Sequence, residues 1–128
     1  MKKKGDQKVV YIKRASMLIE EIGWENFSLE KLARKELIKT EDLNHFFSDK
    51  NQLIECFSEM IDEQVIKEID LAEFNQNSVK DNIFELIMLR FEKLDPYKKS
   101  LTILLKELKY KPRVLNKLTK KIFNSFKP

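Results

Sequence analysis

Glycine and proline are scarce in this sequence: its 128 residues include only two glycines and three prolines. Tight β-turns and phosphate-cradling loops depend on these residues, so such elements have few places to form. Helices joined by short connections need neither residue in quantity. The shortage therefore favours an all-α chain, and this length is sufficient for one compact core.

Cysteine and histidine occur once each. Cys56 cannot form an internal disulfide, and no histidine lies near it in the sequence to activate its thiol. His45, as the only histidine, cannot belong to a histidine cluster that binds a metal. Zinc-ligand spacings, phosphate loops and nucleophile elbows are also missing. We therefore expect no enzymatic activity, no metal and no cofactor.

Long apolar runs are absent as well. No stretch approaches the length that a bilayer-spanning helix needs. The first residues, MKKKGDQK, lack the apolar segment of a signal peptide. A cytoplasmic location is the resulting expectation.

Acidic and basic residues are segregated, although the formal net charge is only +4. Residues 1–14 carry six basic groups against Asp6 alone, and residues 96–128 carry ten against Glu107 alone. Residues 55–95 carry eleven acidic groups against four basic ones. A solvated helix face is sufficient to explain any one of these charged segments. Together, however, they indicate that the two ends of the chain could face a polyanion and the middle could not.

Apolar residues recur at helical spacing through the first half of the chain, without sustained period-two alternation. The first predicted helix covers residues 8–22, and Gly23 ends it in a left-handed conformation. Two short helices follow, with Ser28 and Thr40 as their N-caps. Ser48 is predicted to open a longer fourth helix.

The second half continues the same pattern. Residues 73–78 are polar and predict a loop. Ser78 with Asp81 resembles a capping box, and Asp95-Pro96 and Pro112 are predicted to begin two more helices. The total is about seven helices. The helix after Ser78 carries an apolar stripe formed by Val79, Ile83, Phe84, Ile87, Met88, Phe91 and Leu94.

Residues 28–47 fit the geometry of a helix-turn-helix. Two short helices that cross at a wide angle need a small residue at their contact, and Ala33 lies in the middle of the first. The apolar positions before, within and after the turn are Leu32, Ile38, Leu43 and Phe46. The second helix is then free to present its N-terminal side chains to DNA base edges.

The segments LIEEIGWENFSLEKLA and LNHFFSDKNQLIECF resemble the DNA-binding region of TetR-type bacterial repressors. The resemblance covers residues 11–57. Matching positions are Gly23, Ser28, Ala33, Leu43, His45, Phe46, Phe47, Lys50 and Leu53. It implies an N-terminal helix-turn-helix domain over residues 1–52 and a helical dimerisation or ligand-binding part, short for the family, over residues 53–128.

The same resemblance implies double-stranded operator DNA as the partner and repression as the function. Lys50 and the N-terminal arm would hold phosphates. Thr40, Asn44 and His45 would contact phosphate or base edges. The implied DNA-contacting residues are Ser28, Lys39, Thr40, Asn44, His45 and Lys50.

Two positions depart from the family pattern. Leu37 stands where the family turn usually has glycine, and a left-handed backbone disfavours leucine, so we expect a turn of different shape. Glu41 and Asp42 follow the Thr40 cap, where they stabilise the positive end of the helix dipole. Near DNA they would repel phosphates, so they predict weak or selective binding.

A second class of function remains open. The segment DNIFELIMLRFEKLDPYKKSLTILLKELKYKP is also similar to the TetR-fold accessory proteins of ubiquinone biosynthesis, which bind lipid and not DNA. That resemblance implies a lipid or small apolar ligand. Residues 112–128 pair an apolar stripe with lysines, which suits packing on the domain or, less commonly, contact with an anionic membrane. A homodimer is expected if the chain binds DNA. Either the apolar faces of the last two predicted helices form its interface, or the chain is a truncated regulator.

Overall fold

The computed structural model describes residues 4–69, 71–109, 113, 116 and 120. Regular structure in this part of the chain is entirely helical, which confirms the all-α prediction there. The predicted helix from Pro112 lies almost entirely outside the described residues. The elements are α1 (Lys4–Ile22), α2 (Leu29–Lys35), α3 (Thr40–Asn44), α4 (Lys50–Glu68), α5 (Leu71–Gln76), α6 (Val79–Leu94), the 3-10 helix η1 (Asp95–Tyr97) and α7 (Lys98–Leu108).

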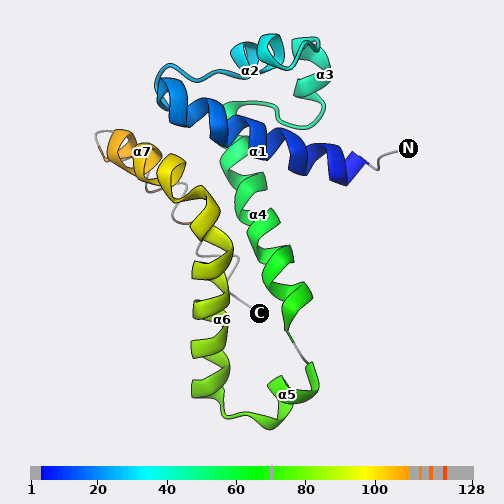
Figure 1. Ribbon diagram of the computed structural model, residues 1–128, viewed down its shortest axis with the longest axis vertical. Helices are drawn as coiled ribbons and strands as arrows, with labels where there is room; N and C mark the ends of the chain where they lie inside the picture. Colours follow the sequence, from blue (N-terminus) through cyan, green and yellow to red (C-terminus); the bar gives the residue numbers. More distant parts are fainter. Residues whose placement is uncertain (1–3, 70, 110–112, 114–115, 117–119, 121–128) are drawn as a thin grey trace.

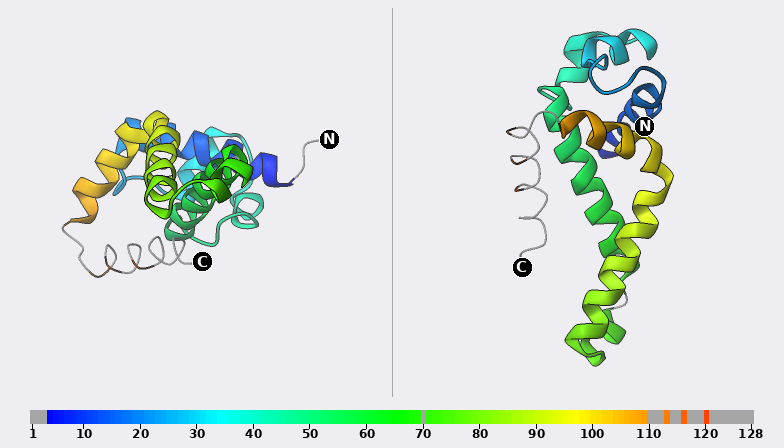
Figure 2. Two further views of the ribbon diagram at one scale, coloured as in Figure 1. Left: turned by 90° about the horizontal axis from the view of Figure 1, so that it is seen from below. Right: turned by 90° about the vertical axis from the view of Figure 1, so that its left-hand side faces the viewer.

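The helices form a head and a stem (Figure 1). The head contains α1, α2, α3 and α7, and the stem contains most of α4, together with α5 and α6. In the stem α4 and α6 pack side by side, and α7 returns to pack against α1 (Figure 2). The predicted boundary between residues 52 and 53 falls inside α4, which is one continuous helix from head to stem.

Several helix ends lie where the sequence predicts them. The Ser28 and Ser78 hydroxyls each accept a hydrogen bond from the backbone N–H three residues later, at 3.1 and 3.2 Å, so both predicted caps are confirmed. Gly23 has a φ of +82°, the left-handed conformation expected after α1. α1 itself begins at Lys4, one turn before the predicted start.

Two predicted caps are wrong. Thr40 is the first residue of α3, and Lys39 holds the cap position without a side-chain hydrogen bond. α4 is capped by Asp49 and not by Ser48: the Asp49 carboxylate accepts from the backbone N–H three residues later at 2.7 Å. A carboxylate is the stronger acceptor and also favours the positive end of the helix dipole, which explains the shift.

Two other segments differ from the prediction. Part of the expected loop at residues 73–78 belongs to α5, because its polar residues mark an exposed helix and not a break. Asp95 does not cap a new helix at Pro96. Instead Asp95, Pro96 and Tyr97 form η1, which joins α6 to α7.

One hydrophobic core connects the head to the upper stem. Its largest fully buried side chains are Phe27, Phe47, Leu32, Leu43 and Ile61. These residues come from α2, α3, α4 and the connections that precede α2 and α4, so the short helices are held by packing and not by their own length. Truncating a buried phenylalanine of this kind to alanine costs about 3–5 kcal/mol.

Candidate nucleic-acid interface

The turn between α2 and α3 has the hydrogen bonds of a Schellman motif. Leu37 donates its backbone N–H to Arg34 O at 3.2 Å, and Ile38 donates to Ala33 O at 3.0 Å. Leu37 has a φ of +58°, so this leucine adopts the left-handed conformation that glycine would favour. Leu37 adopts this conformation with its side chain 92% exposed. The expected difference from the family's turn stays a prediction.

α3 is fixed by its buried side. Leu43 in α3 and Phe47 just after it are fully buried, and Ala33, which is 1% exposed, lies on the α2 side of the same core. Phe46 packs beside Tyr11 of α1, with 5.5 Å between ring centroids. The core therefore sets the orientation of a helix that is only five residues long.

The other side of α3 faces solvent. Asn44 and His45 are exposed, as are Lys39 before the helix and the two acids Glu41 and Asp42. Thr40 is half-buried. Four of the six predicted DNA-contacting residues thus lie within seven consecutive residues at one edge of the head: Lys39, Thr40, Asn44 and His45.

The other two predicted contacts are used inside the protein. The Ser28 hydroxyl caps α2. The Lys50 ammonium donates to the carbonyls of Trp24 and Phe27, at 3.0 and 3.5 Å, and lies 4.5 Å from the centroid of the Trp24 ring. In this conformation Lys50 stabilises the connection between α1 and α2.

A second charged side chain, from α7, also stabilises the connection between α1 and α2. Glu107 of α7 accepts hydrogen bonds from the backbone N–H groups of Trp24 and Glu25, at 2.6 and 3.2 Å. A Cβ on Gly23 would lie 3.2 Å from the Glu107 Oε1 atom, so glycine leaves room for this carboxylate. We call residues 23–27 with Lys50 and Glu107 the Trp24 joint. The joint ties α1, α4 and α7 together.

The role of Glu107 does not follow from the local sequence pattern. Its contacts join residues more than eighty positions apart, and helical periodicity carries no information at that range. The one available signal was that Glu107 is the lone acid among residues 96–128.

Basic residues near α2 are largely neutralised by ion pairs. Arg14 pairs with Glu36 at 3.5 Å, and Lys35 pairs with Glu21 at 2.9 Å. Arg34 pairs with Glu30 within α2. All of these side chains except Glu36 are exposed, and each pair contributes little stability. Together with Glu41 and Asp42 they limit the positive potential that this edge presents to a polyanion.

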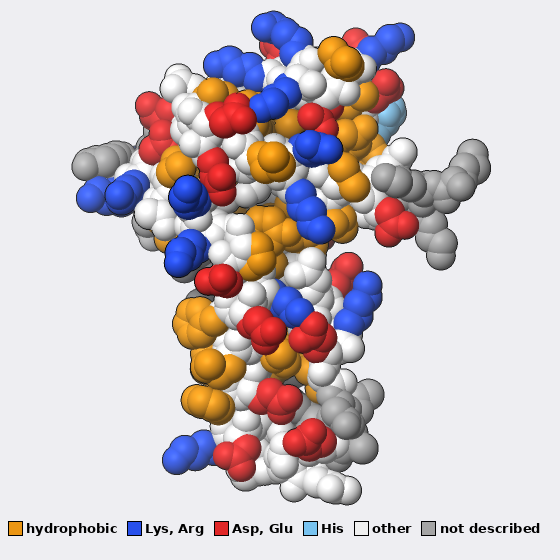
Figure 3. Space-filling view, in the orientation of Figure 1, with side chains coloured by type: hydrophobic (Ala, Val, Ile, Leu, Met, Phe, Trp, Pro, Cys, Tyr) orange, Lys and Arg blue, Asp and Glu red, His pale blue; other side chains and the backbone are white. Residues whose placement is uncertain are grey.

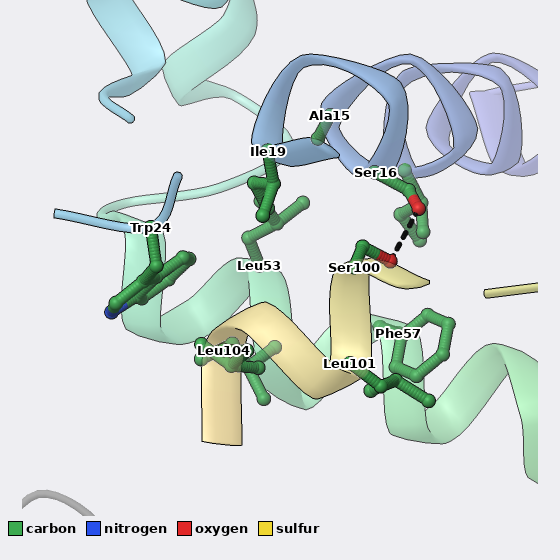
Figure 4. Close-up of a pocket in the computed structure, with 11 residues that line it drawn as sticks. Ala15, Ser16, Ile19, Trp24, Leu53, Phe57, Ser100, Leu101 and Leu104 are labelled. Carbon is green, nitrogen blue, oxygen red and sulfur yellow. Dashed lines mark hydrogen bonds between the residues drawn. The ribbon is translucent and has the colours of Figure 1, made fainter. Parts of the chain in front are cut away.

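A small cavity lies between α1, α4 and α7 (Figure 4). Its volume is about 40 Å³, and apolar side chains including Ile19, Leu53 and Leu104 line it. The Ser16 and Ser100 hydroxyls hydrogen-bond at 2.7 Å beside it. A space of this size holds one to three waters at roughly 15 Å³ each.

Burial raises the pKa of the Cys56 thiol above its ordinary value, although nearby Lys8 acts in the opposite direction. This thiol is consequently a packing group and a poor nucleophile. Among the described residues no cluster of three or more histidine, cysteine or acidic side chains is arranged to hold a metal ion. The described helices also include none with the length and apolar character to traverse a bilayer.

No protein-family model matches the sequence, and no curated protein or solved structure is significantly similar to it.

Proposed function

We propose that this protein is a sequence-specific DNA-binding regulator of transcription, with α2, the Leu37 turn and α3 acting as a helix-turn-helix of the TetR type. The observation that carries the proposal is the two-sided character of α3. Leu43 and Phe47 fix one side in the core, and Asn44 and His45 are exposed on the other. A short helix held this way can enter a major groove without losing its support.

The exposed side chains have the chemistry for both kinds of DNA contact. Asn44 can make a bidentate contact with adenine, and His45 can donate to or accept from a base edge. Lys39 and Thr40, at the start of α3, suit phosphate oxygens. Lys50 would contact phosphate only by leaving the carbonyls of the Trp24 joint, so we assign it a positioning role first.

Glu41 and Asp42 give the proposed interface its selectivity. Repulsion between these carboxylates and the phosphates lowers the affinity for every DNA sequence. A carboxylate that accepts a hydrogen bond from a cytosine amino group offsets this loss only at a site with cytosine at that position. Non-specific binding should therefore be weak for a protein with a net charge of +4.

The test is a salt titration of binding to the DNA upstream of the protein's own gene, compared with a random duplex of equal length. Replacing Asn44 or His45 with alanine should reduce the difference between the two DNAs by about 1–3 kcal/mol. Replacing Lys39 with alanine should weaken both equally and lower the salt slope by about one. The Lys67→Ala variant is the matched control, because Lys67 is an exposed lysine near the far end of α4.

Equal binding to both DNAs in the native protein, with no effect of Asn44→Ala, would refute the proposal. Binding that tightens on both DNAs when Glu41 and Asp42 become Gln and Asn would show that these acids only repel. Tightening on the random duplex alone would show that they select the site.

A lipid-binding or membrane-associated accessory protein is the second candidate. The exposed apolar face of α6 favours it. Co-sedimentation with vesicles containing anionic lipid, without any preference for the upstream DNA, would support this candidate over the first.

A further inference from the structure

An open, polar cleft lies between the head and the stem. Its volume is about 540 Å³, within the range of roughly 300–1,000 Å³ that is typical of small-molecule sites. α1 forms one wall, and α4, the end of α6 and η1 form the rest. The cleft shares only Ser16 with the 40 Å³ cavity, and no residue of α3 lines it. We call it the α1 cleft.

The α1 wall of this cleft carries two opposite charges with an apolar side chain between them. Lys13, Met17 and Glu20 lie at i, i+4 and i+7, so they fall within about 60° of one another around the helix. Lys13 and Glu20 are about 10.5 Å apart along the helix axis, at 1.5 Å per residue. Met17 is 54% exposed. The wall can therefore contact a molecule that has an apolar body and one charge at each end.

Three of the four charged side chains that line the cleft are free to bind a ligand. Lys13, Glu20 and Glu92 are exposed and form no ion pair with any residue in the described part of the chain. The fourth, Lys93, is held by Glu68. Unpaired charges are ordinary on a protein surface, but here one ammonium and two carboxylates line the same concave site. Such a set matches a zwitterion.

The surrounding surface does not favour an ion of one sign. Figure 3 shows acidic and basic side chains interspersed over the part of the molecule below α1. A surface of mixed charge concentrates neither anions nor cations by long-range attraction. Recognition in the cleft therefore depends on the individual charges that line it.

The uncharged lining suits peptide groups. The half-buried Gln64 amide can both donate and accept hydrogen bonds, and the Ser16 hydroxyl can accept one beyond its bond to Ser100. Pro96 adds apolar surface, and the flexible thioether of Met17 adapts to different side chains. The lining thus offers hydrogen bonds to a backbone and contact to small side chains.

We propose that the α1 cleft binds a short free peptide, with its carboxylate at Lys13 and its ammonium at Glu20 and Glu92. An extended chain spans at most about 3.3–3.6 Å per residue, so about three residues match the separation of Lys13 and Glu20. The proposal goes beyond DNA binding, uses none of the predicted DNA-contacting residues and is measured without DNA. Its failure and the failure of DNA binding are therefore separate results.

Isothermal titration calorimetry of the full chain with trialanine is the first test. We expect saturable binding with a Kd below about 1 mM. N-acetyl-trialanine amide lacks both terminal charges and should bind at least roughly tenfold more weakly. Absence of saturable binding below that concentration, or equal binding of the capped peptide, overturns the proposal. Equal binding of trialanine amide, which carries only the positive charge, would indicate a site for cations and also overturns it.

Half-capped peptides assign each protein charge to one end of the ligand. Lys13→Gln should weaken trialanine binding by about 3–10-fold but leave trialanine amide unaffected, because that ligand has no carboxylate. Glu20→Gln and Glu92→Gln should weaken trialanine binding but leave N-acetyl-trialanine unaffected. Lys106→Gln is the matched control, because Lys106 is an exposed lysine of α7 outside the cleft. Equal losses for the free and half-capped peptides would refute the assignment of the two ends.

Filling the cleft tests its location without a change of charge. Met17→Trp adds bulk at the middle of the α1 wall and should abolish trialanine binding, while far-UV circular dichroism shows that the fold is retained. Met88→Trp is the matched control, because Met88 is a methionine of α6 that is 50% exposed and lies outside the cleft. Unchanged binding by Met17→Trp, or equal loss in both variants, would place the peptide elsewhere and overturn the proposal.

Discussion

Replacing Leu37 by glycine should stabilise the protein. Leu37 has a φ of +58°, a conformation that costs an L-residue about 1–2 kcal/mol relative to the right-handed one. Its side chain is 92% exposed, so its removal loses almost no buried surface. Glycine gives back roughly 0.5–1 kcal/mol because it is more flexible in the unfolded chain. The net gain should be about 0.5–1 kcal/mol.

Urea unfolding followed by far-UV circular dichroism measures this gain, with a rise in Tm of about 2–5 °C as a second measure. The Leu37→Ala variant is the matched control, because alanine removes the same exposed side chain but retains the Cβ that makes the conformation unfavourable. It should change stability much less than glycine does. An equal gain in both variants would show that the benefit comes from removing an exposed leucine, and backbone strain would then be the wrong explanation.

Three further predictions concern the Trp24 joint and the buried titratable groups. Glu107→Ala should lower the free energy of unfolding by about 1–3 kcal/mol, because two backbone N–H groups lose their acceptor. Glu107→Gln should lower it less. An alanine variant as stable in urea as the native protein would contradict this role. Burial raises the pKa of Tyr97, so the tyrosine ionises first in the unfolded state and the free energy of unfolding should fall as the pH rises above about 10. Urea unfolding at pH 9 and pH 11 measures this fall, and it should be smaller in the Tyr97→Phe variant. Iodoacetamide should alkylate Cys56 much more slowly in the native protein than in urea at pH 8, and equal rates would show that the thiol is accessible.

The sequence predicts the parts of this fold that depend on local chemistry. The Ser28 and Ser78 caps and the left-handed Gly23 each follow from a few neighbouring residues, and each is confirmed. Thr40 and Ser48 fail as caps because a neighbouring residue takes the cap position, a choice that helical periodicity does not resolve.

Long-range contacts are the part that the sequence does not predict. Nothing in the local pattern indicates that Glu107 meets the turn after α1, or that Lys50 is held by the Trp24 and Phe27 carbonyls. The apolar stripe of α6 was correctly located, but periodicity only identifies a face and does not specify what lies against it. Of the predicted interface, the exposure of Asn44 and His45 agrees with the structure, and their contact with DNA stays a prediction.

Trp24 is the only tryptophan of the chain, and this gives the protein a built-in optical reporter. Its indole is 2% exposed, stacks on Phe27 with centroids 5.9 Å apart and has the Lys50 ammonium above its ring. Burial should shift the fluorescence emission of Trp24 to the blue, and the nearby Lys50 ammonium should quench part of it. Withdrawal of Lys50 towards a phosphate, or a shift of α7 that frees Glu107, would change the spectrum without any added label.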